Sequence, residues 1–315
     1  MRIIHGSDNF PRDARGAVLA VGNFDGVHRG HRALLLAARE EGLRSGRPAG
    51  VILFEPHPRE FFQPNHPHFR LTPLPRKLVL LRELGLELAV VLRFDASLAG
   101  LSAELFVERV LVAALGARHI VVGYDFRFGK GRSGDPESLR MAGRAHGFGV
   151  TIVGQVGEAG EVFSSSAIRA ELAQGDVEGA AQMLGHWWRV GGPVIGGARR
   201  GTGLGFPTAN VALERGVTLG HGIYAVRVYV DHQRYDGAAY LGTRPMFDNG
   251  EPVLEVFLLD FEGELYGREI EVEFIGFVRA DARLPSLEAL IAQMTQDCTR
   301  ARAILAAAPD QPPVA

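Results

Sequence analysis

The chain has 315 residues, 46% of them hydrophobic, and a formal net charge of −2. This length suffices for two hydrophobic cores and predicts two domains. The small net charge gives no basic field, which argues against nucleic acid as the main partner. A single cysteine, Cys298, excludes an internal disulfide and fits a reducing compartment. No apolar run resembles a signal peptide or reaches the length of a membrane span, so we expect a cytoplasmic protein with no membrane partner.

Residues 1–185 alternate short apolar runs with helix-forming segments. Strands separated by helices in this way predict βαβ units and a doubly wound parallel sheet, which is an α/β fold. The runs expected as strands are 17–21, 50–54, 88–92, 119–123 and 150–153. The segments expected as helices lie near 31–45, 74–84, 102–115 and 136–146.

The segment 22–31, Gly-Asn-Phe-Asp-Gly-Val-His-Arg-Gly-His, joins the first of these strands to the first helix. A strand, a glycine turn and a helix in that order place backbone N–H groups and a positive dipole end where phosphates are usually bound. His28 and His31 share one face of the first turn if the helix starts near Val27. There they can donate hydrogen bonds to phosphate oxygens and to a leaving pyrophosphate. The glycines that permit tight turns and close approach of a ligand are Gly22, Gly26 and Gly30.

Two other interpretations of this segment remain open: an ordinary α/β turn with surface histidines, or half of a zinc site. Zinc needs third and fourth ligands at short spacing, and the one cysteine lies at position 298. A phosphate site is therefore favoured. A second histidine group, His57, His66 and His68, suggests a metal site, but the density of proline around it favours a semi-rigid surface loop.

Two further segments of the first half follow predicted strands. Residues 123–135 enter a glycine-rich, aromatic loop that has no assignable ligand by itself. Three consecutive hydroxyls, Ser164, Ser165 and Ser166, stand at the start of a predicted helix, which they can cap.

After Leu184 the pattern changes to short strands separated by tight turns, which predicts an antiparallel sheet or a small barrel. The expected strands are 222–230, 234–242, 253–260 and 269–278. One helix follows, capped by Ser286, and its apolar stripe is expected to consist of Leu287, Leu290, Ile291 and Met294. We place the domain boundary between residues 185 and 186, and we expect residues 309–315 to be a disordered tail.

The segment 201–210 combines a dense set of glycines with two oxygen-bearing side chains. Glycines can form a backbone cradle for phosphate. Thr208 and Asn210 are oxygen ligands suited to magnesium. The alternative is a glycine-rich hairpin in which Pro207 interrupts a strand.

Glu255 alternates with Val253 and Phe257, so these three side chains share one face of a strand. On such a mostly apolar face, desolvation would raise the pKa of a carboxylate toward that of a useful general base. The alternative, an edge-strand glutamate that reaches water, is equally compatible with the spacing.

The segment 22–31 matches the pattern GxFDGxHxGH, which resembles the HxGH signature of adenylyl-transferring nucleotidyltransferases. In this form it is similar to the amino-terminal module of bacterial bifunctional riboflavin kinase/FAD synthetases. Residues 123–135 resemble that family's GxDFxFGxxRxGD segment, and 163–169 resemble its ISSTxIR segment. The string Gly-Phe-Pro-Thr-Ala-Asn at 205–210 resembles its riboflavin kinase motif.

The resemblance implies a nucleotidyltransferase domain at 1–185 and a small antiparallel β-barrel kinase domain with a C-terminal helix at 186–308. It implies phosphorylation of riboflavin to FMN by ATP, and adenylylation of FMN to FAD with release of pyrophosphate. Adenylyl transfer needs no protein nucleophile, because the enzyme orients the FMN phosphate for in-line attack on the α-phosphorus of ATP. The implied partners are riboflavin, FMN and ATP, with Mg²⁺ bound largely through the ATP phosphates. A homo-oligomer is left open.

The resemblance also assigns residues to the adenylyltransferase site. His28, His31 and Arg169 would be catalytic, with the Arg169 guanidinium suited to the β- and γ-phosphates. The residues implied to bind ATP or flavin are Gly22, Phe24, Asp25, Gly26, Gly30, Gly123, Asp125, Phe126, Phe128, Arg132, Ser164, Ser165 and Ser166.

In the kinase half, the resemblance implies that Glu255 takes the proton from the terminal ribityl hydroxyl as that oxygen attacks the γ-phosphate. The implied ATP- or flavin-binding residues are Gly201, Gly205, Pro207, Thr208, Asn210 and Arg279. Of these, Thr208 and Asn210 would bind the metal.

Four positions depart from residues common in the family, namely Thr202, Tyr240, Met246 and Leu284. An arginine is common at the first of these, where Arg199 or Arg200 could substitute for its cationic contact. The departures keep open an FMN adenylyltransferase whose second domain binds flavin without phosphorylating it. A flavin-sequestering protein without turnover is a rival of another class.

Overall fold

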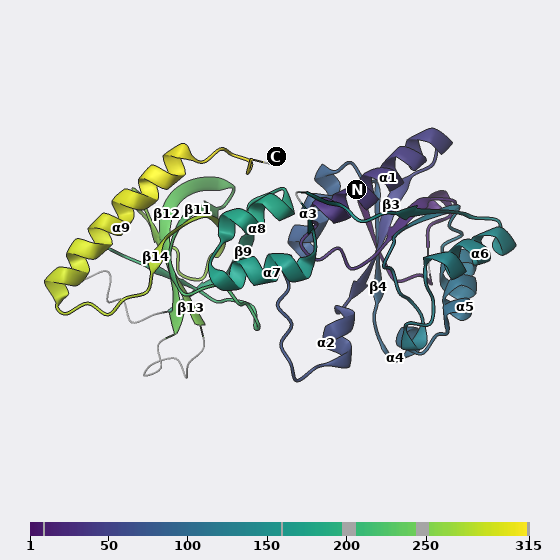
Figure 1. Ribbon diagram of the computed structural model, residues 1–315, viewed down its shortest axis with the longest axis horizontal. Helices are drawn as coiled ribbons and strands as arrows, with labels where there is room; N and C mark the ends of the chain where they lie inside the picture. The colour runs from purple at the N-terminus through teal and green to yellow at the C-terminus, as the bar shows by residue number, and fades with distance from the viewer. Residues whose placement is uncertain (9, 159, 197–205, 244–251, 314–315) are drawn as a thin grey trace. The chain divides into compact units, whose positions relative to one another are not determined.

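The computed structural model describes residues 1–8, 10–158, 160–196, 206–243 and 252–313 (Figure 1). Its contacts divide the chain into two compact units. The first unit consists of Met1–His68 with Thr72–Phe163, and the second of Phe69–Leu71 with Ser164–Ala315.

The first unit is built on a parallel sheet of six strands in the order β1-β4-β3-β2-β5-β6. Its strands are β1 (Arg2–His5), β2 (Val18–Val21), β3 (Ala49–Glu55), β4 (Leu88–Arg93), β5 (His119–Gly123) and β6 (Gly149–Val153). The parallel sheet and five of the strands confirm the prediction. The sixth, β1, was missed because it is a short edge strand in which Ile4 alone is buried.

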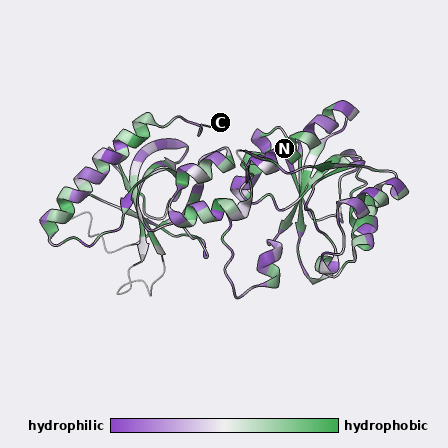
Figure 2. Cartoon of the chain, viewed as in Figure 1, coloured by the Kyte–Doolittle hydropathy of each residue, from purple (hydrophilic) through white to green (hydrophobic). Residues whose placement is uncertain are grey.

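Helices cover both faces of this sheet, as the doubly wound prediction requires. On one face, α1 (Arg29–Ser45) and α3 (Leu74–Glu83) share a core with Val18 and Ala20 of β2. On the other face, η2 (Phe106–Ala114) and α6 (Pro136–His146) share a core with Leu19 and Val21. Successive side chains of a strand point to opposite faces, so a continuous apolar run serves both cores. Figure 2 shows the hydrophobic colouring of these strands.

The remaining elements of the first unit are short. The helix expected over 102–115 is a single turn, α5 (Ala103–Leu105), that continues as the π-helix η2. The other short elements are η1 (Arg12–Ala14), α2 (Pro58–Phe62), α4 (Ala96–Ala99), η3 (Lys130–Arg132), β7 (Gly157–Glu158) and β8 (Glu161–Val162).

The second unit contains a closed antiparallel barrel in the order β10-β13-β12-β11-β14-β9. Its strands are β9 (Arg189–Ile195), β10 (Ala209–Val211), β11 (Gly222–Val230), β12 (Gln233–Thr243), β13 (Pro252–Leu258) and β14 (Glu269–Ala280). Pairing of Asn210 with Ile195 closes the barrel. Four strands confirm the prediction. Sequence reasoning missed β9, which contains two glycines and a proline, and β10, which has three residues.

Three helices accompany the barrel: α7 (Ser165–Gln174), α8 (Val177–Leu184) and α9 (Leu287–Ala307). The Ser286 side chain accepts a hydrogen bond from the Ala289 N–H, which confirms the predicted N-cap of α9. The predicted apolar stripe is wrong at its first position, because Leu287 is 53% exposed. The buried residues of α9 are Asp297, Ala301 and Leu305, so the helix packs through its C-terminal half.

The contacts change units at residues 163–164, whereas the sequence places a domain boundary at 185/186. Ala181 of α8 belongs to one apolar cluster with Ala225 and Ile275 of the barrel, and the contacts therefore group α8 with the second unit. The boundary at 185/186 stays a prediction about the sequence.

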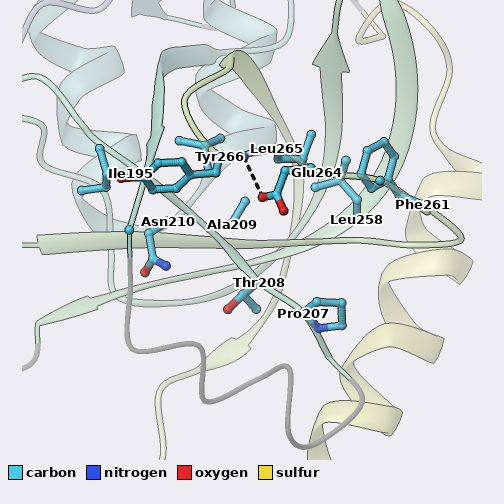
Figure 3. Close-up of a pocket in the computed structure, with 13 residues that line it drawn as sticks. Ile195, Pro207, Thr208, Ala209, Asn210, Leu258, Phe261, Glu264, Leu265 and Tyr266 are labelled. Carbon is cyan, nitrogen blue, oxygen red and sulfur yellow. Dashed lines mark hydrogen bonds between the residues drawn. The ribbon is translucent and has the colours of Figure 1, made fainter.

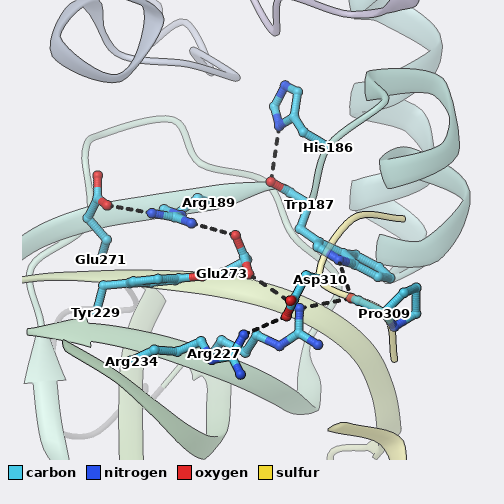
Figure 4. Close-up of polar contacts among 10 residues, drawn as sticks. All are labelled: His186, Trp187, Arg189, Arg227, Tyr229, Arg234, Glu271, Glu273, Pro309 and Asp310. Carbon is cyan, nitrogen blue, oxygen red and sulfur yellow. Dashed lines mark hydrogen bonds and ion pairs between the residues drawn. The ribbon is translucent and has the colours of Figure 1, made fainter. Parts of the chain in front are cut away.

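The first residues of the expected disordered tail are held by side chains of the barrel unit (Figure 4). The Pro309 carbonyl accepts hydrogen bonds from Trp187 Nε1 at 3.3 Å and from Arg227 Nη1 at 3.0 Å. Asp310 pairs with Arg234 at 2.7 Å. Pro309 and Asp310 are therefore held by contacts, in contrast to the expected disorder of the tail. Buried donors require acceptors, and these residues supply them.

The packing of β3 on β4 generates a stability prediction. A Cβ on Gly50 would lie 2.6 Å from both the Cβ and the carbonyl oxygen of Leu88, its partner across the two strands. Gly50→Ala should lower the free energy of unfolding by roughly 2–3 kcal/mol, because it overpacks the sheet centre. Denaturant titration of both variants checks this against Gly154→Ala, whose Cβ would meet nothing within 4 Å. Equal losses in the two variants would contradict the account.

Candidate active sites

The strand order of the first unit reverses between β2 and β5, and loops carrying the predicted motifs follow these two strands. Ligands of open α/β sheets bind beyond the carboxyl ends of the strands at such a reversal. Gly22 and Asn23 after β2 line one cavity together with Asp125, Phe126 and Phe128 after β5. The fold thus joins into one site two motifs that are 100 residues apart in the chain.

This cavity has a volume of about 610 Å³, and its walls contain several phenylalanines. The phenylalanines that line it are Phe54, Phe62, Phe94, Phe106, Phe126 and Phe128. The rings of Phe126 and Phe128 stack with centroids 5.4 Å apart. The exposed Arg59, Arg127 and Arg132 also line it. Flat apolar walls with cations suit a planar ring system that carries an anionic group.

His28 forms the N-cap of α1 and follows the cavity residues Gly22 and Asn23 in the sequence. Its Nδ1 accepts a hydrogen bond from the His31 N–H at 3.3 Å. A neutral imidazole whose Nδ1 accepts must carry its proton on Nε2, which leaves Nε2–H as a donor. The His28 and His31 rings stack with centroids 3.6 Å apart. The structure therefore brings both predicted histidines together, with His28 as the cap and not as a helical residue.

His31 is half-buried in the first turn of α1 and contacts the edge of the Phe24 ring, with centroids 5.3 Å apart. Its Nδ1 is buried and has no hydrogen-bond partner among the described residues. Burial, followed by the charges of His28 and Lys77, holds the pKa of His31 well below its usual 6.5. At neutral pH it is therefore an uncharged imidazole, able to donate from one nitrogen and accept at the other.

The loop between β2 and α1 has a strained backbone. Phe24 and Val27 have φ angles of 46° and 44°, a region that costs a side chain about 1–3 kcal/mol, while Gly26, at 91°, adopts it freely. Asp25 is 3% exposed, and its Oδ1 accepts a hydrogen bond from the Thr72 N–H at 3.1 Å. This predicted ligand residue therefore uses one carboxylate oxygen to hold the loop.

Gly30 allows close packing in the first turn of α1. A Cβ here would lie 3.1 Å from the His28 ring and 3.2 Å from the Phe163 carbonyl oxygen. A neighbouring contact was missed by sequence reasoning: the Arg29 guanidinium pairs with Glu158 at 2.6 Å and covers the Phe163 ring at 4.4 Å. No spacing rule links residues this far apart.

Gly123 ends β5, where a Cβ would lie 3.1 Å from Asp125 Oδ1.

The serine segment begins α7 of the second unit. Ser164 is its N-cap, and the side chain accepts a hydrogen bond from the Ala167 N–H at 3.1 Å. Ser165 and Ser166 begin the helix itself. The Arg169 guanidinium donates to the carbonyl oxygens of Phe69, at 2.8 Å, and of Ser165, at 3.2 Å. Ser164 therefore caps the helix, which is the purely structural role considered above. Arg169 connects α7 to the backbone of Phe69.

The barrel holds a second constellation, at the pairing of β10 with β13. Asn210 lies directly opposite Glu255, and Thr208 Oγ1 donates to Glu255 Oε2 at 3.4 Å. Pro207, Thr208 and Asn210 line a cavity of about 290 Å³ together with Tyr266 (Figure 3). Threonine, asparagine and glutamate thus present hard oxygen atoms from two adjacent strands.

The alternation predicted for β13 is present. Val253, Glu255 and Phe257 are half-buried, whereas Leu254 and Val256 between them are fully buried. Glu255 consequently lies on the half-buried face, where the Thr208 hydroxyl contacts one carboxylate oxygen, Oε2, and the other, Oε1, is buried.

Two expectations for the kinase half have different outcomes. Arg279 is not among the residues that line the cavity, because it forms a two-pronged ion pair with the buried Asp297 of α9 at 2.8 Å. Tyr240 lies opposite Glu255 on β12, and its hydroxyl donates to Asp281 at 3.1 Å. Predicted or discussed residues that fall outside the described part of the chain are Arg199, Arg200, Gly201, Thr202, Gly205 and Met246.

The histidines that suggested a metal site pack together in part. The rings of His57 and His68 lie 4.4 Å apart, and burial, followed by the charge of His68, lowers the pKa of His57 to about 4. In the described part of the chain, no group of three or more histidine, cysteine, aspartate or glutamate residues could hold a metal ion. Thr208 and Asn210, beside Glu255, are oxygen donors of the kind that Mg²⁺ prefers when it also binds nucleotide phosphates.

Within the ranges that the structure describes, none of the helices combines the length and the apolar character needed to cross a bilayer.

Comparison with known proteins assigns both halves to characterised families. The FAD synthetase family model matches residues 10–167, and the riboflavin kinase family model matches residues 184–305. The chain is 42% identical over 304 residues to the bifunctional riboflavin kinase/FMN adenylyltransferase of Escherichia coli (strain K12), covering 96% of this chain and 97% of that protein. It is 41% identical over 307 residues to that of Pseudomonas fluorescens, covering 97% and 98%.

A solved structure shares the whole fold. A Streptococcus pneumoniae protein described as a macrolide-efflux protein superposes with a TM-score of 0.87 at 28% identity, covering 96% of this chain and 99% of that one.

Proposed function

The chain belongs to the bifunctional riboflavin kinase/FMN adenylyltransferase family, and from that premise we propose that it converts riboflavin to FMN and FMN to FAD. One observation carries the proposal: a phenylalanine-lined cavity runs to the loop that ends in two stacked histidines. The walls suit an isoalloxazine ring, and the loop suits phosphates.

In adenylylation, the flavin ring lies between the phenylalanines, and the FMN phosphate points toward Gly22 and Asn23. The Nε2–H of His28 donates to phosphate oxygens, and the uncharged His31 accepts or donates beside it. The first-turn N–H groups of α1 add a positive dipole end. These groups stabilise the charge that moves to pyrophosphate as the FMN phosphate attacks the α-phosphorus in line. No protein nucleophile takes part.

The other assigned residues support this site in different ways. We propose that Ser165, Ser166 and Arg169 bind the triphosphate, since two hydroxyls and a guanidinium at a helix N-terminus favour an anion. Asp125 and Arg132 line the flavin cavity. Asp25 and Gly26 act on the loop itself, through the hydrogen bond from Thr72 and the positive φ.

In phosphorylation, Glu255 accepts the proton of the terminal ribityl hydroxyl as that oxygen attacks the γ-phosphate of ATP. The Thr208 hydroxyl, 3.4 Å from Glu255 Oε2, orients this carboxylate. Thr208 and Asn210 would hold Mg²⁺, which when bound neutralises charge on the ATP phosphates. The contact between Thr208 and Glu255 favours a working kinase over a domain that only binds flavin.

We further propose a cytoplasmic location and no nucleic-acid partner, on the strength of the single cysteine and the net charge of −2. The sequence-based domains, 1–185 and 186–308, and a homo-oligomeric state also remain proposals.

The proposed function is tested by chromatography of the products formed with ATP and Mg²⁺ from riboflavin in one tube and from FMN in another. We expect FMN and FAD from riboflavin, FAD from FMN, and no product when EDTA removes the metal. FAD from FMN alone would establish an adenylyltransferase with a silent second domain. No product in either tube would indicate a flavin-binding protein without turnover.

The two roles of His28 can be separated by two substitutions. His28→Ala removes the N-cap acceptor and should lower the free energy of unfolding by about 1 kcal/mol, whereas asparagine caps well, so His28→Asn should retain it. Both variants should lose FAD formation from FMN by roughly 10²-fold or more, because each lacks the Nε2–H donor. Denaturant titration of both variants shows whether the unit that contains His28 is folded, and riboflavin phosphorylation should be unchanged. FAD formation at the wild-type rate in His28→Asn would show that His28 only caps the helix.

Glu255→Gln tests the general base of the kinase. It should reduce FMN formation from riboflavin by roughly 10²–10⁴-fold, because glutamine cannot accept the proton. FAD formation from supplied FMN should stay within about twofold of wild type, since that site uses other residues. The exposed Glu269 on β14 provides a matched control as Glu269→Gln, which should retain both activities. Full FMN formation by Glu255→Gln would reject the assignment.

A further inference from the structure

Lys77 is a buried cation that contacts the loop between β2 and α1. It belongs to none of the motifs described above. Only two of the 34 lysines and arginines in the sequence are lysines, Lys77 and Lys130. Lys77 is 4% exposed, and its Nζ donates to the Asn23 carbonyl oxygen at 2.8 Å. A buried ammonium is costly unless polar groups surround it, so its presence on the inner face of α3 calls for a reason.

Two contacts from the start of α3 hold the strained part of the loop. Lys77 contacts the carbonyl of Asn23, and the N–H of Thr72, just before the helix, donates to Asp25 Oδ1. These contacts lie on either side of Phe24, whose φ is 46°. A backbone in this region persists only where its surroundings over-determine it. The lysine supplies one of the two clamps.

The clamped loop and the first turn of α1 present two polar atoms that no described residue satisfies. Asn23 Oδ1 and His31 Nδ1 are both buried, and neither has a hydrogen-bond partner among the described residues. Asn23 also lines the flavin cavity. Buried polar atoms without partners are rare and indicate a group that arrives with a ligand.

We propose that Lys77 is a positioning residue for adenylyl transfer, which fixes the Asn23 carbonyl so that Asn23 and His31 face the substrate. A compact ammonium can approach a single carbonyl in a tight space, whereas the planar guanidinium used at nearly every other cationic position of this chain cannot. The inference rests on the proposed function, because FMN adenylylation is the reaction that it would affect.

The lysine has a second, electrostatic effect on the same site. The charged or titratable neighbours that act on His31 are His28, from the N-cap of α1, and Lys77, from α3, and both lower its pKa. Removing the cation therefore raises the pKa of His31. We take the uncharged imidazole as the active form. The acid limb of the pH profile of kcat/KM for FAD formation then moves to higher pH.

Three variants test the proposal: Lys77→Met, Lys77→Arg, and Arg82→Met as a control that removes an exposed cation from the same helix. In Lys77→Met, kcat/KM for FAD formation from FMN should fall by about 10²-fold, and the acid limb should move to higher pH. In Lys77→Arg the charge remains, so kcat/KM should fall by about tenfold while the acid limb stays in place. Riboflavin phosphorylation should stay at wild-type levels in all three, and Arg82→Met should retain both activities.

The outcomes separate this inference from the proposed function. FAD formation by Lys77→Met within about twofold of wild type, with an unmoved acid limb, would overturn the role of Lys77 alone. If Lys77→Met fails to fold, as loss of the unfolding transition of the first unit in denaturant titration would show, Lys77→Arg decides, and a wild-type kcat/KM in that variant overturns the proposal. A wild-type protein that forms no FAD from FMN would reject the proposed function instead.

Discussion

The reversal of strand order between β2 and β5 is the constraint on which the adenylylation site depends. It places the ends of two strands that are 100 residues apart in sequence side by side. One strand end continues into the loop that precedes His28 and the other into the loop with Phe126 and Phe128, so the phenylalanine-lined cavity and the start of α1 become neighbours. The strain in Phe24 and Val27, the cap of His28 and the clamp from Lys77 all act on this one junction.

In the barrel, the register of the strands brings the site residues together. Antiparallel pairing of β10 with β13 sets Asn210 opposite Glu255, and Thr208, directly before β10, donates a hydrogen bond to the Glu255 carboxylate. A shift of one residue would turn Glu255 into the barrel interior and turn the buried Leu254 and Val256 out of it. The second site thus depends on strand pairing, whereas the first depends on loops at a sheet edge.

Much of this organisation could be predicted from the sequence, because apolar runs and motif strings are local signals. The parallel sheet, the antiparallel strands from 222 onward and the N-cap at Ser286 followed from periodicity and capping rules. The strands that were missed have weak local signals: β1 buries one side chain, β9 contains glycine and proline, and β10 has three residues.

The partners of the site residues could not be predicted, because they depend on long-range packing. Arg279 was expected to bind ATP or flavin, and in the structure it forms an ion pair with Asp297. The sequence pattern of α9 does not indicate that Asp297 is buried. Lys77 occupies a position that helical periodicity treats as ordinary, and its role depends on the Asn23 carbonyl, which lies 54 residues away in sequence. Its rarity as a lysine in an arginine-rich chain is the one sequence signal that could have singled it out.

The central claim is that one chain carries two independent sites, with adenylylation at the His28–His31 loop and phosphorylation at Glu255. The most direct test mixes purified His31→Ala with purified Glu255→Gln and follows riboflavin, FMN and FAD over time in the presence of ATP and Mg²⁺. The account predicts that the first variant alone stops at FMN, that the second alone leaves riboflavin unchanged, and that the mixture forms FAD through released FMN. FAD from riboflavin by either variant alone, or no FAD from the mixture while FMN accumulates, would contradict it.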